Sequence, residues 1–369
     1  MAKFDAVFEG GGAKGVAFVG ALEVLEQQGH TIRRYLGTSA GAITATLLAA
    51  GYTNPEIMAA VMERLPDGKP RFSSFMDVPA ATDFSDAVRA GSLTMTAFKE
   101  IDLPFVPEAL EGRIETELLD RMLNNSIFAR LFSFTECGGY FSGRTFLAWL
   151  REKLAVKGIT ATDTLADFNR KTGADLSVVT SDTTDMEMLV LNHRTAPDVP
   201  VANAVRMSMS IPFVWEEVVW QAEWGPYLGR TKTGNILVDG GMLSNFPIRL
   251  IASTDDEIKT IMGDTDPNGA RNLGLMIDEK LAVPGQPATD KTPLPVTRLH
   301  TVQRLSRLVD TMMGASDNDV VRHYASDICR LPAKGYGTLE FDMEGDRLNM
   351  FIDASRTAMQ RHLALAATV

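Results

Sequence analysis

The chain has 369 residues, of which 45% are hydrophobic and 22% are charged. This length suggests one large domain or two ordinary ones, and the composition is that of a globular protein. The formal net charge of −11 opposes binding to nucleic acid through the field of the whole molecule, so we expect no nucleic-acid partner. Two cysteines cannot form a disulfide framework or a cysteine-based zinc site, which indicates a reducing compartment.

The sequence contains no predicted targeting or membrane-spanning segment. The N-terminus lacks the charged and apolar regions of a signal peptide, and the most apolar stretch, 40–51, is too short to span a bilayer. We therefore expect a soluble, cytoplasmic protein whose membrane contact, if any, is peripheral. Delivery by a non-classical secretion route stays open, and the sequence carries no signal for an oligomeric state.

The first fifty residues repeat one pattern of strand, glycine-rich turn and helix. Short apolar runs predict strands over 6–8 and 32–36, and apolar residues at helical spacing predict helices over 16–25 and 42–50. This order of elements predicts an α/β fold with a mainly parallel sheet.

Residues 71–145 depart from this pattern. Ten of the 18 phenylalanines lie between Phe72 and Phe146, among prolines, glycines and helical fragments such as 114–123. We interpret the segment as an insertion or lid over the α/β core. Some of its phenylalanines could line an acyl-chain pocket, but for most of them we favour plain packing within a helical subdomain.

Periodic patterns continue to the C-terminus. They predict helices over 146–155, 201–209, 296–313 and 348–366, and strands over 176–180, 186–191, 236–238, 273–277 and 339–343. We divide the chain into a main domain over 1–280 and a C-terminal extension over 281–369 that packs on it. Residues 264–269 match the first half of a calcium-binding loop, but Leu275 replaces the glutamate needed at its twelfth position, so we expect no metal there.

The glycine-rich run 10–15 allows two functional interpretations. Gly10, Gly12 and Gly15 fit the G-x-G-x-x-G pattern of dinucleotide-binding folds, but no acidic residue ends the second strand to bind a ribose. Alternatively, the run forms an oxyanion hole, in which amides of Gly10, Gly11 and Gly12 and a helix N-terminus stabilise developing negative charge, and Lys14 strengthens the field. A tight turn without chemistry must be weighed against both.

Gly37-Thr38-Ser39-Ala40-Gly41 matches G-x-S-x-G, the nucleophile elbow. In this turn a serine is projected between a strand and a helix, and the turn is so sharp that small residues must flank it. The predicted strand before it and the alanine-rich helix after it supply the required context. An ordinary glycine–serine turn is the alternative.

A conventional Ser-His-Asp esterase would also need a catalytic histidine downstream of this serine. None of the five histidines lies in a glycine-rich or strand-end turn that would present such a base. Each is more typical of a surface or structural position; they are His30, His193, His300, His323 and His362. The esterase therefore stays an alternative that one of these residues would have to complete.

Asp239 is another candidate base. It ends the apolar run Ile236-Leu237-Val238 and precedes Gly240 and Gly241, which let the backbone turn away. We expect this carboxylate at the carboxyl edge of the sheet, where open α/β folds build their sites. An aspartate–glycine turn without chemistry is the alternative.

In this order, the three motifs resemble those of the patatin-like phospholipase family of bacterial type. Residues 208–213 (SMSIPF) are similar to the family's serine-rich segment, and residues 239–247 (DGGMLSNFP) to its Asp-Gly-Gly segment. The resemblance covers about residues 4–250, interrupted by the insertion. It implies a patatin-like α/β fold with a mainly parallel sheet flanked by helices, to which the 71–145 insertion and the C-terminal extension are additions that no family motif matches.

The resemblance also implies a mechanism. Ser39 would attack the ester of a glycerolipid or phospholipid substrate, and Asp239 would act as general base in a dyad without histidine. Amides of Gly10–Gly12 would hold the oxyanion, and Lys14 occupies a position where the family often carries Arg or Lys. Supporting roles fall to the motif glycines Gly15, Gly37, Gly41, Gly240 and Gly241. We expect a phospholipase A or lysophospholipase without cofactor or metal, and keep the triad esterase and a non-hydrolytic dinucleotide-binding module as alternatives.

Overall fold

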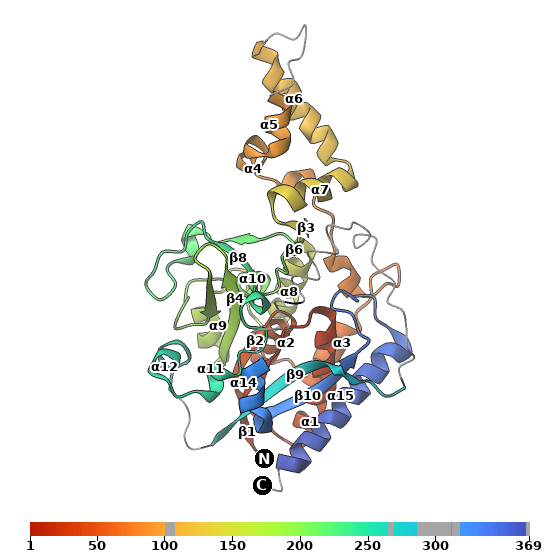
Figure 1. Ribbon diagram of the computed structural model, residues 1–369, viewed down its shortest axis with the longest axis vertical. Coiled ribbons are helices and arrows are strands. Elements are labelled where there is room, and N and C mark those ends of the chain that lie inside the picture. Colours follow the sequence, from red (N-terminus) through yellow and green to blue (C-terminus); the bar gives the residue numbers. More distant parts are fainter. Residues whose placement is uncertain (100–107, 265–268, 286–310, 312–317, 367–369) are drawn as a thin grey trace.

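A computed structural model of the chain describes residues 1–99, 108–264, 269–285, 311 and 318–366 (Figure 1). Almost all of the helix predicted over 296–313 and most of the calcium-loop match at 264–269 lie outside the described residues. His300 also lies outside them.

The centre of the fold is a sheet whose strands follow one another in the order β10-β9-β1-β2-β4-β8-β7, with β5 also paired with β4. Neighbours from β10 to β4 run parallel, whereas β5, β8 and β7 join in antiparallel pairs. The strands are β1 Lys3–Phe8, β2 Thr31–Thr38, β4 Asp175–Asp182, β5 Glu187–Leu191, β7 Val218–Val219, β8 Ile236–Asp239, β9 Ala270–Ala282 and β10 Ile328–Lys334. The predicted α/β class with a mainly parallel sheet is confirmed.

Alternation along the buried strands divides the core between the two faces of the sheet. Phe4, Ala6 and Phe8 of β1 pack into the larger cluster, while Val7, which points to the opposite face, joins the smaller one. This period of two is what a strand buried on both faces requires.

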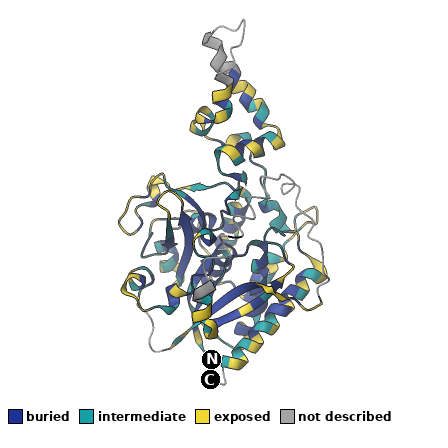
Figure 2. Cartoon of the chain, viewed as in Figure 1, coloured by how far each residue is buried: buried dark blue, intermediate teal, exposed yellow. Residues whose placement is uncertain are grey.

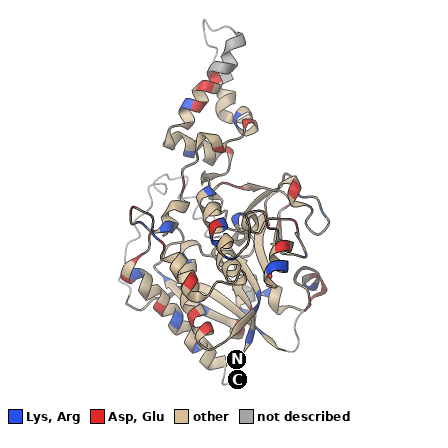
Figure 3. Cartoon of the chain, turned by 180° about the vertical axis from the view of Figure 1, so that it is seen from behind, with Lys and Arg blue, Asp and Glu red and all other residues tan. Residues whose placement is uncertain are grey.

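Helices cover both faces of this sheet (Figure 1). Their bounds are α1 Ala17–Gln27, α2 Ala40–Ala49, α3 Asn54–Val61, α4 Asp86–Gly91, α5 Leu93–Lys99, α6 Glu108–Leu123, α7 Ser126–Glu136, α8 Arg144–Val156, α9 Leu165–Thr172, α10 Val201–Ser208, α11 Arg249–Ala252, α12 Asp256–Met262, α14 Asn318–His323 and α15 Gly345–Ala366. Acidic and basic residues are interspersed along them (Figure 3). Among the helices of the described residues, none combines the length and the apolar composition that a bilayer span requires.

The predicted insertion forms a helical arm, α4 to α7, that projects from the α/β body (Figures 1 and 2). The arm has its own small cluster, in which Phe84 and Phe132 pack with Met95, Leu119 and Leu123. A two-stranded sheet at its base pairs β3 (Gly139–Phe141) with β6 (Phe213–Trp215). The 3₁₀ helix η2 at 71–75 stays with the body, since Phe75 belongs to the main core.

The C-terminal segment is part of the central sheet, whereas the sequence predicts an extension that only packs on the main domain. The predicted boundary at residue 280 falls inside β9, and β10 adds a further parallel strand beside it. Sequence reasoning missed β10 because Pro332 interrupts it; as an edge strand it tolerates a residue without an amide proton.

The strand predicted over 339–343 is wrong, because these residues form an irregular loop between β10 and α15. The apolar alternation there comes from Leu339, Phe341 and Met343, which are all at least half-buried although they belong to no strand. Alternation of this kind is also produced by a loop that lies over a core.

We expect Gly20→Ala to destabilise the protein, because α15 lies against α1 at this glycine. A Cβ at Gly20 would lie 2.1 Å from the Ile352 carbonyl oxygen and 2.9 Å from the Arg356 amide nitrogen. The resulting displacement should outweigh the better helix propensity of alanine and lower the free energy of unfolding by about 1–3 kcal/mol. Urea and thermal unfolding measure it.

Gly91→Ala is the matched control, because no atom lies within 4 Å of its added Cβ. That variant should be neutral or slightly stabilised. Equal stabilities for the two variants would mean that α1 and α15 are not in close contact.

Candidate active site

Ser39 lies in the sharp turn between β2 and α2. Its backbone is strained, with φ 53° and ψ −121°, a conformation that costs a non-glycine residue on the order of 1–3 kcal/mol. The flanking glycines are sterically required: a Cβ at Gly37 would lie 2.3 Å from the Gly41 carbonyl oxygen, and one at Gly41 would lie 2.1 Å from that of Phe8. The structure thus has the geometry of a nucleophile elbow.

The direction of β8 differs from the expectation for Asp239. This strand runs antiparallel to β4, so Asp239 does not end a parallel strand at the carboxyl edge of the sheet. It nevertheless reaches the same place. Thr38 of β2 pairs with Val179 of β4, and Asp239 pairs with the next residue, Thr180.

These registers place β2 and β8 one after the other along the same edge of β4. The opposite edge of β4, from 178 to 182, is already occupied by β5, and a strand residue has only two sides for pairing. The carboxyl ends of β2 and β8 therefore meet head to head, which brings Ser39 and Asp239 together.

Asp239 is fully buried, and this burial raises the pKa of its carboxyl from 3.8 to about 7. The Ser39 hydroxyl and the Gly241 amide act against the rise. The amide donates to Oδ1 at 2.8 Å, whereas Oδ2 has no hydrogen bond of ordinary geometry. Oδ2 is thus the oxygen with capacity to accept a proton.

Two serines of the 208–213 segment support the pair. The Ser39 amide donates to Oγ of Ser208 at 2.9 Å, and the Asp239 amide donates to the carbonyl of Ser210 at 2.8 Å. Ser210 is in turn held by Arg206, a buried guanidinium whose pKa burial lowers to about 10. The sequence of residues 208–213 resembles the family's serine-rich segment, but it does not predict these contacts.

The glycine loop offers fewer oxyanion donors than predicted. The Gly10 amide already donates to the Asn245 carbonyl at 3.0 Å, so it is not available to a substrate. Gly10 is needed instead because the loop passes close to Ser39. A Cβ added at Gly10 would lie 3.2 Å from the Cβ of Ser39. Within the described chain, the amides of Gly11 and Gly12 have no acceptor, and these two are the candidate donors.

Lys14 is buried, and its ammonium pairs with the carboxylate of Glu279 on β9. It does not line the pocket that contains Ser39. Its positive charge is therefore partly neutralised, and a role at the oxyanion stays a prediction. Gly15 has a packing role, since its Cβ would lie 2.8 Å from that of Ala40.

An apolar pocket opens beside Ser39. The pocket lies between α2, α3, α8 and the 3₁₀ helix η2. Its walls include Gly12, Ser39, Leu47, Ile57, Val61, Phe72, Phe75, Phe146, Trp149, Trp215 and Phe341. Such a lining favours a long apolar group next to the serine hydroxyl.

The phenylalanines from Phe72 to Phe146 divide into two groups in the structure, and their binding an acyl chain stays a prediction. Phe72, Phe75 and Phe146 line the pocket, whereas Phe84 and Phe132 pack only within the arm. Sequence spacing alone could not separate the two groups, because both follow helical or loop patterns.

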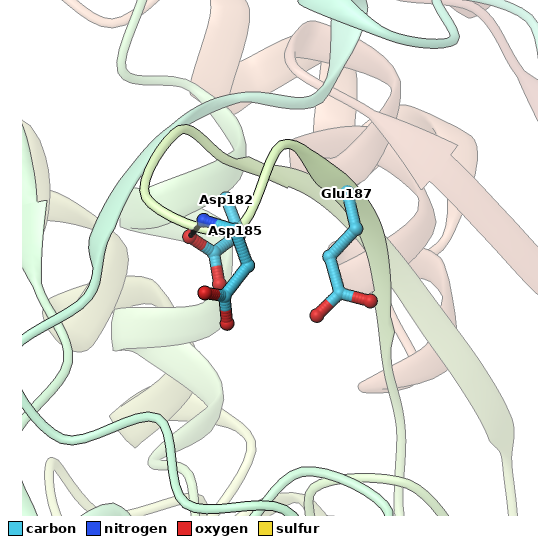
Figure 4. A group of neighbouring side chains, drawn as sticks. All are labelled: Asp182, Asp185 and Glu187. Carbon is cyan, nitrogen blue, oxygen red and sulfur yellow. Dashed lines mark hydrogen bonds between the residues drawn. The ribbon is translucent and has the colours of Figure 1, made fainter.

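Asp182 at the end of β4, Asp185 in the following turn and Glu187 at the start of β5 form an acidic cluster (Figure 4). One ligand atom from each lies within 4.8 Å of the others, as metal ligands would. Lys232 already supplies the positive charge: its ammonium bonds Asp182 at 2.9 Å and Asp185 at 2.5 Å, and also contacts Glu187. We therefore assign this cluster to an internal ion pair.

None of the four described histidines lines the Ser39 pocket. His30 accepts a hydrogen bond from the Ala2 amide, His193 contacts Arg194, and His323 packs on Tyr324. His362 lies on α15. Nothing among them favours the triad esterase.

The fold and the site define an α/β protein with a serine elbow that faces a buried aspartate. A family model described as patatin-like phospholipase matches residues 6–252. The chain therefore belongs to the patatin-like phospholipase family.

Two curated relatives are similar to this chain. The uncharacterized protein YqhO of Bacillus subtilis is 34% identical over 254 residues, covering 67% of this chain and 66% of that protein. The probable lipid hydrolase 463L of Invertebrate iridescent virus 6 is 22% identical over 242 residues, covering 66% and 61%. The chain thus spans slightly less than two thirds of the length of these relatives.

The solved structures that resemble this chain include those of two bacterial proteins. VipD from Legionella pneumophila has a TM-score of 0.46 at 16% identity, covering 98% of this chain and 67% of that chain. The type III effector ExoU of Pseudomonas aeruginosa has a TM-score of 0.43 at 16% identity, covering 99% and 53%.

Lys232→Met should destabilise the protein strongly, because it leaves buried Asp182 without its cation. Burial alone would lower the pKa of Lys232, but hydrogen bonds to the three carboxylates raise it above the usual lysine value. Breaking a buried ion pair from one side costs about 3–5 kcal/mol, which thermal and urea unfolding would measure.

Arg230→Met is the control, because its pair with Glu187 is half exposed. We expect a loss of about 1 kcal/mol or less there. Comparable losses in the two variants would contradict the assigned role of Lys232.

Proposed function

We propose that this chain is a lipid acyl hydrolase that cleaves carboxylic esters through a dyad of Ser39 and Asp239. The observation that carries the proposal is the meeting of a strained serine elbow with a buried carboxylate of pKa about 7, beside an apolar pocket. A base with a pKa near the operating pH is best suited to proton transfer.

In the acylation step, Oγ of Ser39 attacks the ester carbonyl and its proton passes to Asp239. The amides of Gly11 and Gly12 would hold the resulting oxyanion; losing one such donor typically costs about 10²–10³ in rate. The tetrahedral intermediate then collapses, the ester C–O bond breaks, and Asp239 returns the proton to the departing alcohol. The acyl group stays on Ser39 as an ester.

Deacylation repeats these steps with water. Asp239 accepts a proton from water as its oxygen attacks the acyl carbonyl, and the same amides hold the second oxyanion. When the fatty acid leaves, the proton is returned to Oγ of Ser39. The free enzyme is thereby regenerated.

The lining of the pocket supports a lipid as the acyl donor. Its aromatic and aliphatic walls suit a fatty acyl chain, and a curated relative carries the name probable lipid hydrolase. We propose phospholipids or lysophospholipids as substrates, in keeping with the family. Peripheral contact with a lipid surface would supply them to the pocket.

Ser39→Ala and Asp239→Asn should each abolish hydrolysis while the protein stays folded. The first variant removes the nucleophile and the second the base, so each should lower kcat by at least about 10³-fold. Hydrolysis of a fluorogenic lysophospholipid, with fluorophosphonate labelling mapped by mass spectrometry, provides the measurement. Label should appear on Ser39 in the wild type and be absent from Ser39→Ala.

Two exposed positions supply matched controls. Ser126→Ala and Asp256→Asn make the same chemical changes at residues outside the pocket, and both should keep wild-type activity. Persistent activity in either Ser39→Ala or Asp239→Asn would reject the dyad. Labelling that depends on a histidine instead would favour the triad esterase.

The pH dependence of kcat/KM should follow the carboxyl of Asp239. The base is active only when ionised, and burial raises its pKa to about 7. Activity should therefore reach half of its plateau near pH 7 and fall about tenfold for each further unit below it. Circular dichroism at each pH separates titration from unfolding, and a plateau that extends unchanged to pH 5 would contradict this role.

A further inference from the structure

The residues from Gly335 to Gly345 form a strap between β10 and α15, well beyond the 6–252 match to the family model. Both terminal glycines have positive φ, 91° and 58°, and no atom lies within 4 Å of a Cβ built on either. They supply the two changes of direction that carry the strap away from the sheet and back into α15.

The base of the strap is held firmly. The Tyr336 ring stacks on that of Phe351 with 4.1 Å between centroids, and the Arg347 guanidinium lies 4.1 Å from the Tyr336 centroid. Arg347 also pairs with Glu340 and donates to the Gly335 carbonyl at 2.9 Å. The strap is therefore an ordered part of the fold.

The middle of the strap touches the glycine loop beside Ser39. The Ala13 amide donates to the Thr338 carbonyl at 2.8 Å. A Cβ on Gly12 would lie only 2.2 Å from the same oxygen. The strap thus fixes the loop that carries the candidate oxyanion donors.

Three residues further on, Phe341 enters the wall of the Ser39 pocket. Its ring meets that of Trp215 edge to face, with centroids 5.7 Å apart and planes at 76°. Trp215 is fixed in turn, because its indole donates to the Phe75 carbonyl at 3.0 Å. Phe341 is half-buried, and its side chain forms part of the pocket wall.

We propose that Phe341 is a specificity-determining residue that limits the length of the acyl chain this pocket accepts. The inference rests on the proposed function of Ser39 as the acyl acceptor. The strap contributes a large aromatic ring, held against Trp215, to the wall of the pocket beside the serine, where an acyl chain would bind. Apolar pockets discriminate by fit, and one methylene changes kcat/KM by about 10–200-fold.

Phe341→Ala should shift the chain-length profile towards longer substrates, and Phe341→Trp should shift it towards shorter ones. The assay compares p-nitrophenyl esters with acyl chains from butanoyl to hexadecanoyl. For Phe341→Ala, we expect the ratio of kcat/KM for the long to the short ester to rise at least about tenfold. The change should lie mainly in KM, because Ser39 and Asp239 are untouched.

Leu339→Ala is the matched control on the same strap, since Leu339 packs on the core without lining the pocket. It should keep the wild-type profile. An unchanged profile in both Phe341 variants, or an equal loss for every chain length, would overturn the proposal. Thermal unfolding identifies a variant that fails to fold, in which case Phe341→Leu replaces Phe341→Ala.

A binding measurement separates this inference from the dyad. In the inactive Ser39→Ala background, displacement of a fluorescent fatty acid by saturated fatty acids of increasing length reports the pocket alone. Adding Phe341→Ala should move the preferred length upwards there too. If Ser39→Ala stays active but this shift occurs, the dyad fails and the pocket assignment stands; if the shift is absent, Phe341 does not set the length.

Discussion

The site depends on β2 and β8 meeting head to head along one edge of β4. The pairings of Thr38 with Val179 and of Asp239 with Thr180 leave no residue of β4 between them. Two carboxyl ends that are some 200 residues apart in sequence are thereby fixed by backbone hydrogen bonds, without a side chain having to reach across. The oxyanion loop and the pocket are arranged around this junction, because both border Ser39.

The sequence predicts the features that are set by neighbouring residues, but not those that depend on contacts between residues far apart in the chain. The elbow at Ser39 and the turn after Asp239 were predictable, because each is specified by glycines within a few residues. The antiparallel course of β8 was not, since a short apolar run carries no information about direction. The amide of Gly10 and the ammonium of Lys14 were assigned to the oxyanion, but their partners, Asn245 and Glu279, lie far along the chain.

Strain and burial at the site are balanced by contacts around it. Ser39 has an unfavourable backbone conformation, and its amide is held by Ser208. Asp239 is buried with one oxygen unsatisfied, and the Gly241 and Ser210 contacts restrain it. Regions that depart from local preferences are typical of functional sites, and the surrounding fold must supply the compensating stability.

The burial of Asp239 also couples the stability of the fold to proton concentration. Its carboxyl binds a proton more tightly in the folded chain, with a pKa near 7, than in the unfolded chain, where the value is close to 3.8. The stability that this protonation contributes is complete below about pH 4 and is lost as the pH rises to 7. The ionised carboxylate, which is the form suited to act as a base, is therefore also the form that stabilises the fold least. Raising the pH increases the fraction of active base and at the same time lowers the free energy of unfolding.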